Sequence, residues 1–348
     1  MLSPPRPPRL HLGPARRATR ILGRCPSLRA PYRPTPWAPG PHAQILLLLR
    51  SQARDAPLRY DEVEPLTTED GGLLSLDWLG LEEPEAAPTL VVLPTICGSG
   101  QSLRGLVHRL RAQLGFRVVV CNRRGHAGLP LTTPRFDIVG STADLRAQLA
   151  RVEARLPASP LYGLGVSAGA ALLLRHLGEE GAASPLRAAV ALSAGHDVGR
   201  TLGEMHPAYD RALLRAVKRH FLAPNGAILR DAPGYEALAA ARTMAELDER
   251  LAPLAGYPDA AARRLALDPA VVAARIAVPL LALQAEDDPV CVGRGLGANG
   301  GIFAGVPDAI LAVTHRGSHC AFFEGSRRPS SWAERLIAEY LRGAHEIG

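Results

Sequence analysis

The sequence predicts an α/β protein in which a mostly parallel sheet carries helices on both faces and a helical cap. Short apolar runs alternate with helix-forming segments from residue 58 onward, which is typical of repeated strand–helix units. About 80 residues, from near Ser193 to Val278, have little strand character but several helical patterns. A structureless loop of that length is unusual in a compact domain, so a helical cap is expected over about residues 196–277.

The expected elements follow one another in a simple order. Two antiparallel strands, 59–67 and 73–79, are joined by a turn at Asp70-Gly71-Gly72. The remaining strands cover residues 89–93, 117–121, the run after Pro160, 188–192, 278–284 and 309–314. Helices are expected near residues 102–114, 141–156, 170–177 and 332–342, and within the cap over 211–222, 235–244 and 244–252. Ligands of such sheets gather at the carboxyl ends of the strands.

Composition and charge argue against a nucleic-acid-binding protein. The chain has 348 residues, of which 47% are hydrophobic, and a formal net charge of +7. Residues 1–54 contain ten arginines and no lysine, aspartate or glutamate. Removing these ten from the 40 basic residues leaves 30 against 33 acidic ones, so the body of the protein is slightly acidic.

Residues 1–31 are expected to form a disordered leader or an organelle transit peptide. The segment is rich in arginine and proline and free of acidic residues, although its early prolines would break an amphipathic helix. It lacks the long apolar core of a secretory signal, and the apolar run 45–49 is too short to span a bilayer. An organellar location (chloroplast or mitochondrion) or a cytoplasmic one is therefore expected, without secretion.

The cysteines indicate free thiols in a reducing compartment. Their odd number and the absence of any C-x-x-C pair argue against a disulfide framework or a metal motif. Packing as small apolar side chains is the expected role of Cys25, Cys97, Cys121, Cys291 and Cys320.

The stretch Gly165-Val166-Ser167-Ala168-Gly169 has the form of a nucleophile elbow. An apolar run bounded by Pro160 precedes it, and the helix formers of residues 170–177 follow it. This strand–turn–helix context places the serine on a strained turn that exposes its oxygen, and the glycines let neighbouring backbone approach. Ser167 is therefore predicted to be a catalytic nucleophile.

A dinucleotide-binding fingerprint is the rival interpretation of these residues. The run 163–168 matches its variant ending in alanine, but that fingerprint normally opens a fold on its first strand and precedes an acidic residue. Here the strand lies mid-chain, and the next one ends in Ser193 and Ala194. A second match, 295–300, follows no clear strand and is interpreted as a flexible loop. Nicotinamide binding is disfavoured, and neither a cofactor nor a metal is expected.

The acid that orients a catalytic histidine is sought after the strand 278–284, since the triad partners follow the serine in this type of fold. Glu286, Asp287 and Asp288 stand side by side there. Asp288 is preferred because Pro289 stiffens its loop. The alternative is that the triplet is only an acidic, solvated loop.

The catalytic base is sought after the strand 309–314, where two histidines compete. His315 lies closer to the strand end, whereas Gly317 and the helix soon afterwards favour His319. With this choice the predicted triad is Ser167, Asp288 and His319.

Acyl transfer also needs donors for the developing oxyanion. One is expected to be the backbone N–H of Ala168, directly after the nucleophile. The other is expected in the loop 94–100, where the N–H of Ile96 is assigned and Thr95 contributes only modestly through its hydroxyl. Loss of one such donor typically lowers turnover roughly 10²–10³-fold, so this loop should be rigid.

Several motifs jointly resemble one known family. They are 93–99, 122–125, 132–135, the elbow 165–169, 287–289 and 317–325, together with a similar opening segment over 32–44. Over about residues 32–343 the chain thus resembles the alpha/beta-hydrolase-domain (ABHD) esterase and lipase subfamily. The resemblance implies an alpha/beta-hydrolase fold, with its helical cap, for residues 32–348.

The resemblance also implies a function. It implies a serine hydrolase that cleaves esters of short-to-medium-chain acyl groups, acylglycerols or phospholipids, with Ser167, Asp288 and His319 as the charge-relay triad. Two positions depart from the family, which usually has glycine where this chain has Thr95 and Ser318. Thr95 is expected to narrow or stiffen the oxyanion loop.

Substrate class and partners are the least determined by the sequence. Apolar cap residues are expected either to bind an acyl chain or merely to pack the cap onto the core: Leu213, Leu214, Val217, Phe221 and Leu222. The expected partners are a lipid or a small ester and, peripherally, a membrane surface. An acyltransferase or ester synthase using the same serine is one alternative, although no histidine begins an H-x-x-x-x-D box. A non-catalytic binding protein with a hydrolase fold is the other.

Overall fold

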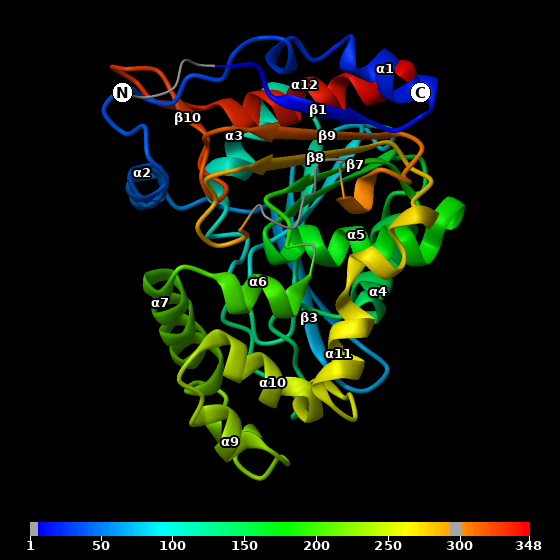
Figure 1. Cartoon of the computed structure of the whole chain (residues 1–348). Helices are drawn as coiled ribbons and strands as arrows, with labels where there is room; N and C mark the ends of the chain where they lie inside the picture. The colour runs from blue at the N-terminus through cyan, green and yellow to red at the C-terminus, as the bar shows by residue number, and fades with distance from the viewer. Residues whose placement is uncertain (1–5, 196, 293–300) are drawn as a thin grey trace.

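Nine strands form one twisted sheet at the centre of the protein (Figure 1). The computed structural model describes residues 6–195, 197–292 and 301–348; the glycine-rich run 295–300 therefore lies outside the described residues. The strand order is β1-β9-β8-β7-β6-β4-β5-β3-β2, parallel from β5 to β9 and antiparallel where β1, β3 and β2 join at the two ends. The strands are β1 (Arg9–Leu12), β2 (Glu62–Thr67), β3 (Leu73–Leu79), β4 (Thr89–Leu93), β5 (Arg117–Asn122), β6 (Leu161–Val166), β7 (Leu186–Leu192), β8 (Leu280–Ala285) and β9 (Ala309–Thr314). The predicted α/β class is confirmed.

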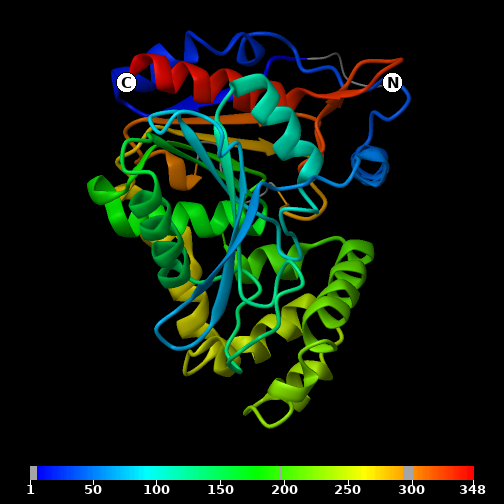
Figure 2. The same cartoon turned by 180° about the vertical axis from the view of Figure 1, so that it is seen from behind.

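Helices cover both faces of the sheet (Figures 1 and 2). One face carries α1 (Arg16–Leu22), α3 (Arg104–Leu114) and α12 (Trp332–Ile347), and the other carries α4 (Thr142–Arg155) and α5 (Ala168–Glu180). Successive residues of β4 point to opposite faces, so Leu90 and Val92 join the first apolar core while Val91 and Leu93 join the second. This explains why the strand runs are apolar throughout.

A cap of helices lies between β7 and β8 and forms a separate layer below the sheet in Figure 1. It consists of α6 (Val198–Glu204), α7 (Pro207–Val217), the π-helical turn η3 (Lys218–Leu222), α8 (Gly226–Leu229), α9 (Tyr235–Ala239), α10 (Met244–Ala255) and α11 (Ala260–Leu267). The buried side chain of Arg263 joins the cap to the sheet domain, since it pairs with Asp248 of the cap and, at 2.6 Å, with Asp137. The sequence analysis expected a cap here but named no helical segment for α6, α8 or α11.

The start of the chain departs from the expectation of a disordered leader over residues 1–31. β1 pairs with β9 and forms one edge of the sheet, and the N–H of Ala18 in α1 donates to Asp308 at 3.1 Å. Ala18 and Ile21 are fully buried in the core shared with α12. A strand of four residues and a helix of seven are too short to show a clear periodicity, and their partners lie about 300 residues away. Cleavage as a transit peptide stays a prediction.

Helix α2 (Pro41–Arg54) contains the apolar run 45–49 and lies at the periphery of the sheet domain (Figure 1). Leu46 and Leu49 are 66% and 54% exposed, so part of the run faces outward. In the described part of the chain no helix combines the length and apolar character needed to cross a membrane.

Candidate active site

Ser167 occupies the turn between β6 and α5, where the chain passes directly from strand to helix. Its backbone has φ 55° and ψ −115°, a strained conformation for a residue other than glycine. The neighbouring glycines are required by close contacts. A Cβ at Gly165 would lie 2.5 Å from the Cα of Ala170, and one at Gly169 would lie 2.2 Å from the carbonyl oxygen of Leu93. The turn therefore presents Ser167 at the carboxyl edge of the sheet, as its motif predicts.

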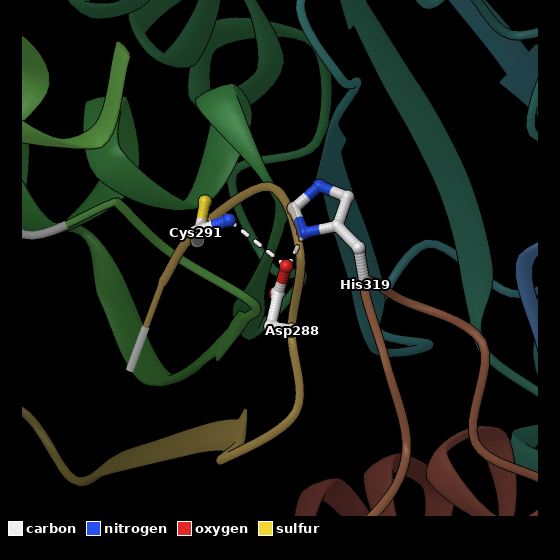
Figure 3. Close-up of side chains that lie close together, drawn as sticks. All are labelled: Asp288, Cys291 and His319. Atoms are coloured by element: carbon white, nitrogen blue, oxygen red, sulfur yellow. Dashed lines mark hydrogen bonds and ion pairs between the residues drawn. The ribbon is translucent and has the colours of Figure 1, made fainter. Parts of the chain in front are cut away.

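Asp288 and His319 come from the loops after the neighbouring strands β8 and β9 and lie side by side in Figure 3. Nδ1 of His319 lies 2.8 Å from Oδ2 of Asp288, and Nε2 lies 2.9 Å from Oγ of Ser167. The side chain of Asp288 is fully buried and that of His319 is 14% exposed. The structure thus brings the three predicted residues together, with one imidazole between a carboxylate and a hydroxyl.

Backbone groups hold Asp288 in this orientation. Its Oδ1 accepts the N–H groups of Val290 at 2.8 Å and Cys291 at 2.9 Å, which leaves Oδ2 for His319. Burial is the largest single influence on His319 and lowers its pKa, but the charge and hydrogen bond of Asp288, together with smaller influences of Cys320 and Cys291, hold that pKa well above its ordinary value. An imidazolium that forms by taking a proton at Nε2 is therefore stabilised by the carboxylate beside it.

The competing acids and histidine lie in different surroundings. Nδ1 of His315 contacts Glu286 at 2.9 Å, and Arg9 pairs with the same carboxylate at 3.5 Å, all near the surface. Asp287 instead accepts the backbone N–H of Ser318 at 2.8 Å, and burial raises the pKa of its carboxyl. The loops after β8 and β9 therefore supply two histidine–carboxylate pairs, of which only the inner one reaches Ser167 among the described hydrogen bonds.

The loop 94–100 lies beside the nucleophile. Ile96, Ser167 and Ala168 line the same cavity. Ala168 is the first residue of α5, so its N–H has no partner within the helix and can face the cavity. The structure therefore brings both predicted oxyanion residues to Ser167, and their role as donors stays a prediction.

Arg123 is a buried cation behind this loop, and sequence reasoning found it only as part of a motif. Its guanidinium donates to the carbonyl oxygens of Thr95 and, at 2.9 Å, of Val139. Burial lowers the pKa of Arg123 to about 10, so the side chain remains charged at neutral pH. His126 contacts the carbonyl oxygen of Ile96 at 2.9 Å, and burial together with the charge of Arg123 lowers the pKa of His126 to about 3. Arg123 and His126 thus hold the backbone of the loop 94–100 in place through its carbonyl oxygens.

The cavity at Ser167 is small and mostly apolar, with a volume of about 60 Å³. Of the cap residues expected to meet an acyl chain, only Leu213 lines it, whereas the other four are buried in the core of the cap. The cap contributes three further lining residues that the sequence did not single out: Thr201, Leu202 and Met205. A larger cavity of about 600 Å³, rich in charged side chains, is lined by none of Ser167, Asp288 and His319.

Cys291 is a neighbour of the triad that sequence reasoning assigned only to packing. Figure 3 shows its side chain beside Asp288 and His319. Burial raises the pKa of the Cys291 thiol, and the nearby His319 only partly opposes that rise. The thiol is therefore protonated at neutral pH and poorly suited to act as a nucleophile. In the described part of the chain, Asp288, Cys291 and His319 are the group whose side chains could together hold a metal ion.

Comparison with known proteins identifies related sequences. A family model described as the alpha/beta hydrolase fold matches residues 88–326. Human protein ABHD15 is 30% identical over 343 residues, covering 94% of this chain and 71% of ABHD15. Mouse phospholipase ABHD3 is 28% identical over 360 residues, covering 98% of this chain and 85% of ABHD3.

A similar fold also occurs among solved structures. The Pyrococcus furiosus esterase Pf2001 matches with a TM-score of 0.52 and 16% identity, covering 84% of this chain and 94% of the esterase. At that identity the likeness shows the fold alone. The family match and the two relatives place the chain in the alpha/beta hydrolase family and in its ABHD subfamily.

Proposed function

We propose that this carboxylic ester hydrolase works through Ser167 as nucleophile, His319 as general base and Asp288 as the residue that orients the imidazole. One observation carries the proposal. A continuous chain of hydrogen bonds runs from Ser167 Oγ to His319 Nε2 at 2.9 Å and from His319 Nδ1 to Asp288 Oδ2 at 2.8 Å. The strained backbone at Ser167 adds support, because residues held in sparsely populated conformations cluster at active sites.

The reaction follows from this arrangement. Ser167 Oγ attacks the ester carbonyl while His319 Nε2 takes the hydroxyl proton, and the same imidazolium then protonates the departing alcohol. The oxyanion of the tetrahedral intermediate accepts hydrogen bonds from the N–H groups of Ile96 and Ala168. Water, deprotonated by His319, releases the acid from the acyl-serine. Throughout, Asp288 keeps the proton on Nδ1, so that Nε2 is free to accept.

The proposed substrates are esters of short-to-medium-chain acyl groups, with acylglycerols or phospholipids as the natural class. The apolar side chains of Leu202, Met205 and Leu213 support this proposal because they line the cavity beside Ser167. Each methylene buried there contributes about 0.8 kcal/mol. A cavity of about 60 Å³ is far below the roughly 300 Å³ that a drug-sized ligand fills. Longer acyl chains therefore require the cap side chains to move apart.

The test is covalent labelling combined with turnover of p-nitrophenyl esters from acetyl to long-chain. A fluorophosphonate should label the wild-type protein and leave Ser167→Ala unlabelled, and kcat/KM should rise with each methylene until the cavity is filled. Labelling of Ser167→Ala at the wild-type rate would remove Ser167 from its role. A rate that peaks at acetyl and falls with every added carbon would contradict the lipid-ester assignment.

Acyl transfer to an alcohol is the second candidate, because the same acyl-serine can react with an alcohol in place of water. Adding ethanol to the assay separates the two outcomes, since a transferase forms ethyl ester in preference to free acid. A non-catalytic binding protein would release at most one equivalent of p-nitrophenol per chain.

We also propose that α2 brings the protein to a lipid surface. Trp37, Leu46 and Leu49 are 59%, 66% and 54% exposed, and α2 ends with the basic side chains of Arg50 and Arg54. Exposed apolar groups beside basic ones favour an anionic membrane surface. Sedimentation with phosphatidylserine vesicles should therefore retain the wild-type protein and lose the double variant Leu46→Ser/Leu49→Ser. Equal sedimentation of both proteins would contradict the proposal.

A further inference from the structure

We propose that Asp288, Cys291 and His319 form a binding site for Zn²⁺, and that the bound ion switches the esterase off. The three side chains come from the loops after β8 and β9, and their potential ligand atoms all lie within 4.8 Å of one another. Asp288 and Cys291 are buried, and His319 is partly buried (Figure 3). The inhibitory effect rests on the proposed function of His319, whereas the binding itself does not.

The chemistry of the three side chains matches zinc. A thiolate, an imidazole and a carboxylate are the ligands that Zn²⁺ takes in proteins, at about 2.3 Å for sulfur and about 2.0–2.2 Å for nitrogen and oxygen. In a tetrahedral site such ligand atoms lie about 3.5 Å apart. His319 Nδ1 and Asp288 Oδ2 are 2.8 Å apart and have to separate by about 0.6 Å, whereas the Cys291 sulfur, within 4.8 Å of both, has to move inward by at most about 1.3 Å.

The surroundings of the three residues are also those of a usable site. The carboxylate of Asp288 is fixed by the backbone N–H groups of Val290 and Cys291, which leave Oδ2 directed at His319. Hydrogen bonds of this kind orient metal ligands and raise affinity. Cys291 also lines the cavity beside Ser167, whose volume of about 60 Å³ exceeds the roughly 15 Å³ that a water needs as fourth ligand.

Binding would abolish the base without touching the nucleophile. Zinc forms a bond to the Cys291 sulfur, and the thiol proton leaves to solvent. The ion also takes the place of the proton on His319 Nδ1, and the neutral imidazole then carries its proton on Nε2. Nε2–H can donate to Ser167 but cannot accept the serine proton, so general-base catalysis stops. Starting from the neutral imidazole, one proton is released for each ion bound, and an imidazolium releases one more; no oxidation or reduction occurs.

Binding can be tested in the inactive variant Ser167→Ala of the full chain, with Co²⁺ as a spectroscopic probe for Zn²⁺. A sulfur-to-cobalt charge-transfer band should appear and should vanish when Zn²⁺ is added. Adding Cys291→Ala should remove the band, and Cys291→Ser, which keeps the side-chain size, should remove it in a protein with unchanged circular dichroism. The matched control is Cys320→Ala, which removes the thiol next to His319 and should retain the band.

Inhibition is tested separately in the active chain. Zn²⁺ should inhibit p-nitrophenyl ester hydrolysis reversibly, with full recovery in EDTA. Cys291→Ala should raise the half-inhibitory concentration, measured against the variant's own zinc-free rate, at least about 10-fold, as loss of a ligand requires. Cys320→Ala should change it less than about twofold, as expected for a thiol outside the ligand set.

The outcomes separate this inference from the proposed function. A cobalt band in a chain that hydrolyses no ester supports the site and contradicts the esterase. Ester hydrolysis without a band, or a band that survives Cys291→Ala and Cys291→Ser, overturns the site and leaves the esterase standing. Equal zinc inhibition of the wild type and Cys291→Ala also overturns it.

Discussion

The loops after β8 and β9 together form two neighbouring histidine–carboxylate pairs. The inner pair joins His319 to Asp288 at 2.8 Å, and the outer pair joins His315 to Glu286 at 2.9 Å. In both pairs Nδ1 of the imidazole faces the carboxylate. By distance and by atom they are equivalent, yet only the inner pair has the features of a catalytic group.

The difference lies in burial and in the partners around each pair. The side chains of the inner pair are 14% and 0% exposed, whereas those of the outer pair are 52% and 42% exposed. Nε2 of the inner histidine contacts Ser167, while Glu286 is shared with Arg9. An exposed pair is screened by water and contributes little. A short histidine–carboxylate distance is therefore insufficient to identify a charge relay.

The largest expected effect comes from breaking each pair in turn. His319→Ala should lower kcat by about 10⁴–10⁶-fold and Asp288→Asn by about 10⁴-fold, because each removes the base or its correct tautomer. The matched changes His315→Ala and Glu286→Gln should leave kcat within about twofold, since exposed pairs contribute little. Steady-state hydrolysis of a p-nitrophenyl ester measures all four. A loss beyond tenfold in either outer variant would mean that the outer pair takes part in catalysis.

The pH dependence sharpens the same contrast. His319 must be neutral to accept a proton, and its pKa lies well above the ordinary value: burial lowers it, but the charge of Asp288 and smaller neighbouring influences together raise it by more. We therefore expect kcat/KM to be constant at alkaline pH and to fall about tenfold per pH unit below that raised pKa. Glu286→Gln should leave this acidic limb in place. In the slow Asp288→Asn variant the limb should move to lower pH, because the strongest influence that raises the pKa of His319 is lost while burial still lowers it; an unmoved limb would assign it to another group.

A smaller effect on kcat is expected when the oxyanion loop 94–100 beside Ser167 is loosened. Both histidine–carboxylate pairs stay intact in this test. Arg123→Gln removes the charged donors to the carbonyl oxygens of Thr95 and Val139. We expect kcat to fall about 10–100-fold with little change in KM, as for partial loss of an oxyanion donor. Arg135→Gln, at a side chain 52% exposed, is the control and should have no effect on kcat. A rise in KM at constant kcat would instead place Arg123 in substrate binding.

The sequence predicts those parts of the site that depend on residues close together in the chain. The glycines and the strained backbone that define the turn at Ser167 lie within five residues of one another, so a short sequence motif is enough to predict this turn. Asp288 and His319 could be found from chain order and strand ends. The proximity of Cys291 could not, because it depends on how the chain turns after Pro289, which no short pattern records.

The same limit explains the start of the chain. The parallel strands were predictable because burial on both faces makes them continuously apolar. β1 could not be predicted, since its four residues pair with an edge of β9 that only the folded sheet provides. The cap helices were predictable as a class, but which of their apolar side chains face Ser167 depends on tertiary packing, so Leu213 could not be separated from Leu214.

The smallest expected effect is on the free energy of unfolding and concerns Ser318, which lies between His315 and His319. Comparing Ser318 with Ser193 shows which contacts hold this segment in place. Ser318 and Ser193 are both fully buried with positive φ, 62° and 51°. The hydroxyl of Ser193 accepts the N–H of Cys320 at 3.1 Å, whereas that of Ser318 has no partner in the described part of the chain. Glycine relieves a left-handed conformation that costs about 1–2 kcal/mol and loses about 0.5–1 kcal/mol through chain entropy.

Ser318→Gly should therefore raise the free energy of unfolding by about 1 kcal/mol, since it also removes a buried hydroxyl without a partner. Ser193→Gly relieves the same backbone strain but leaves the N–H of Cys320 without its acceptor. It should therefore lower the free energy of unfolding by about 1 kcal/mol. Urea unfolding with linear extrapolation measures both variants. If the two changes are equal, the backbone conformation alone decides stability here, and the Ser193–Cys320 hydrogen bond does not position the loop that carries His319.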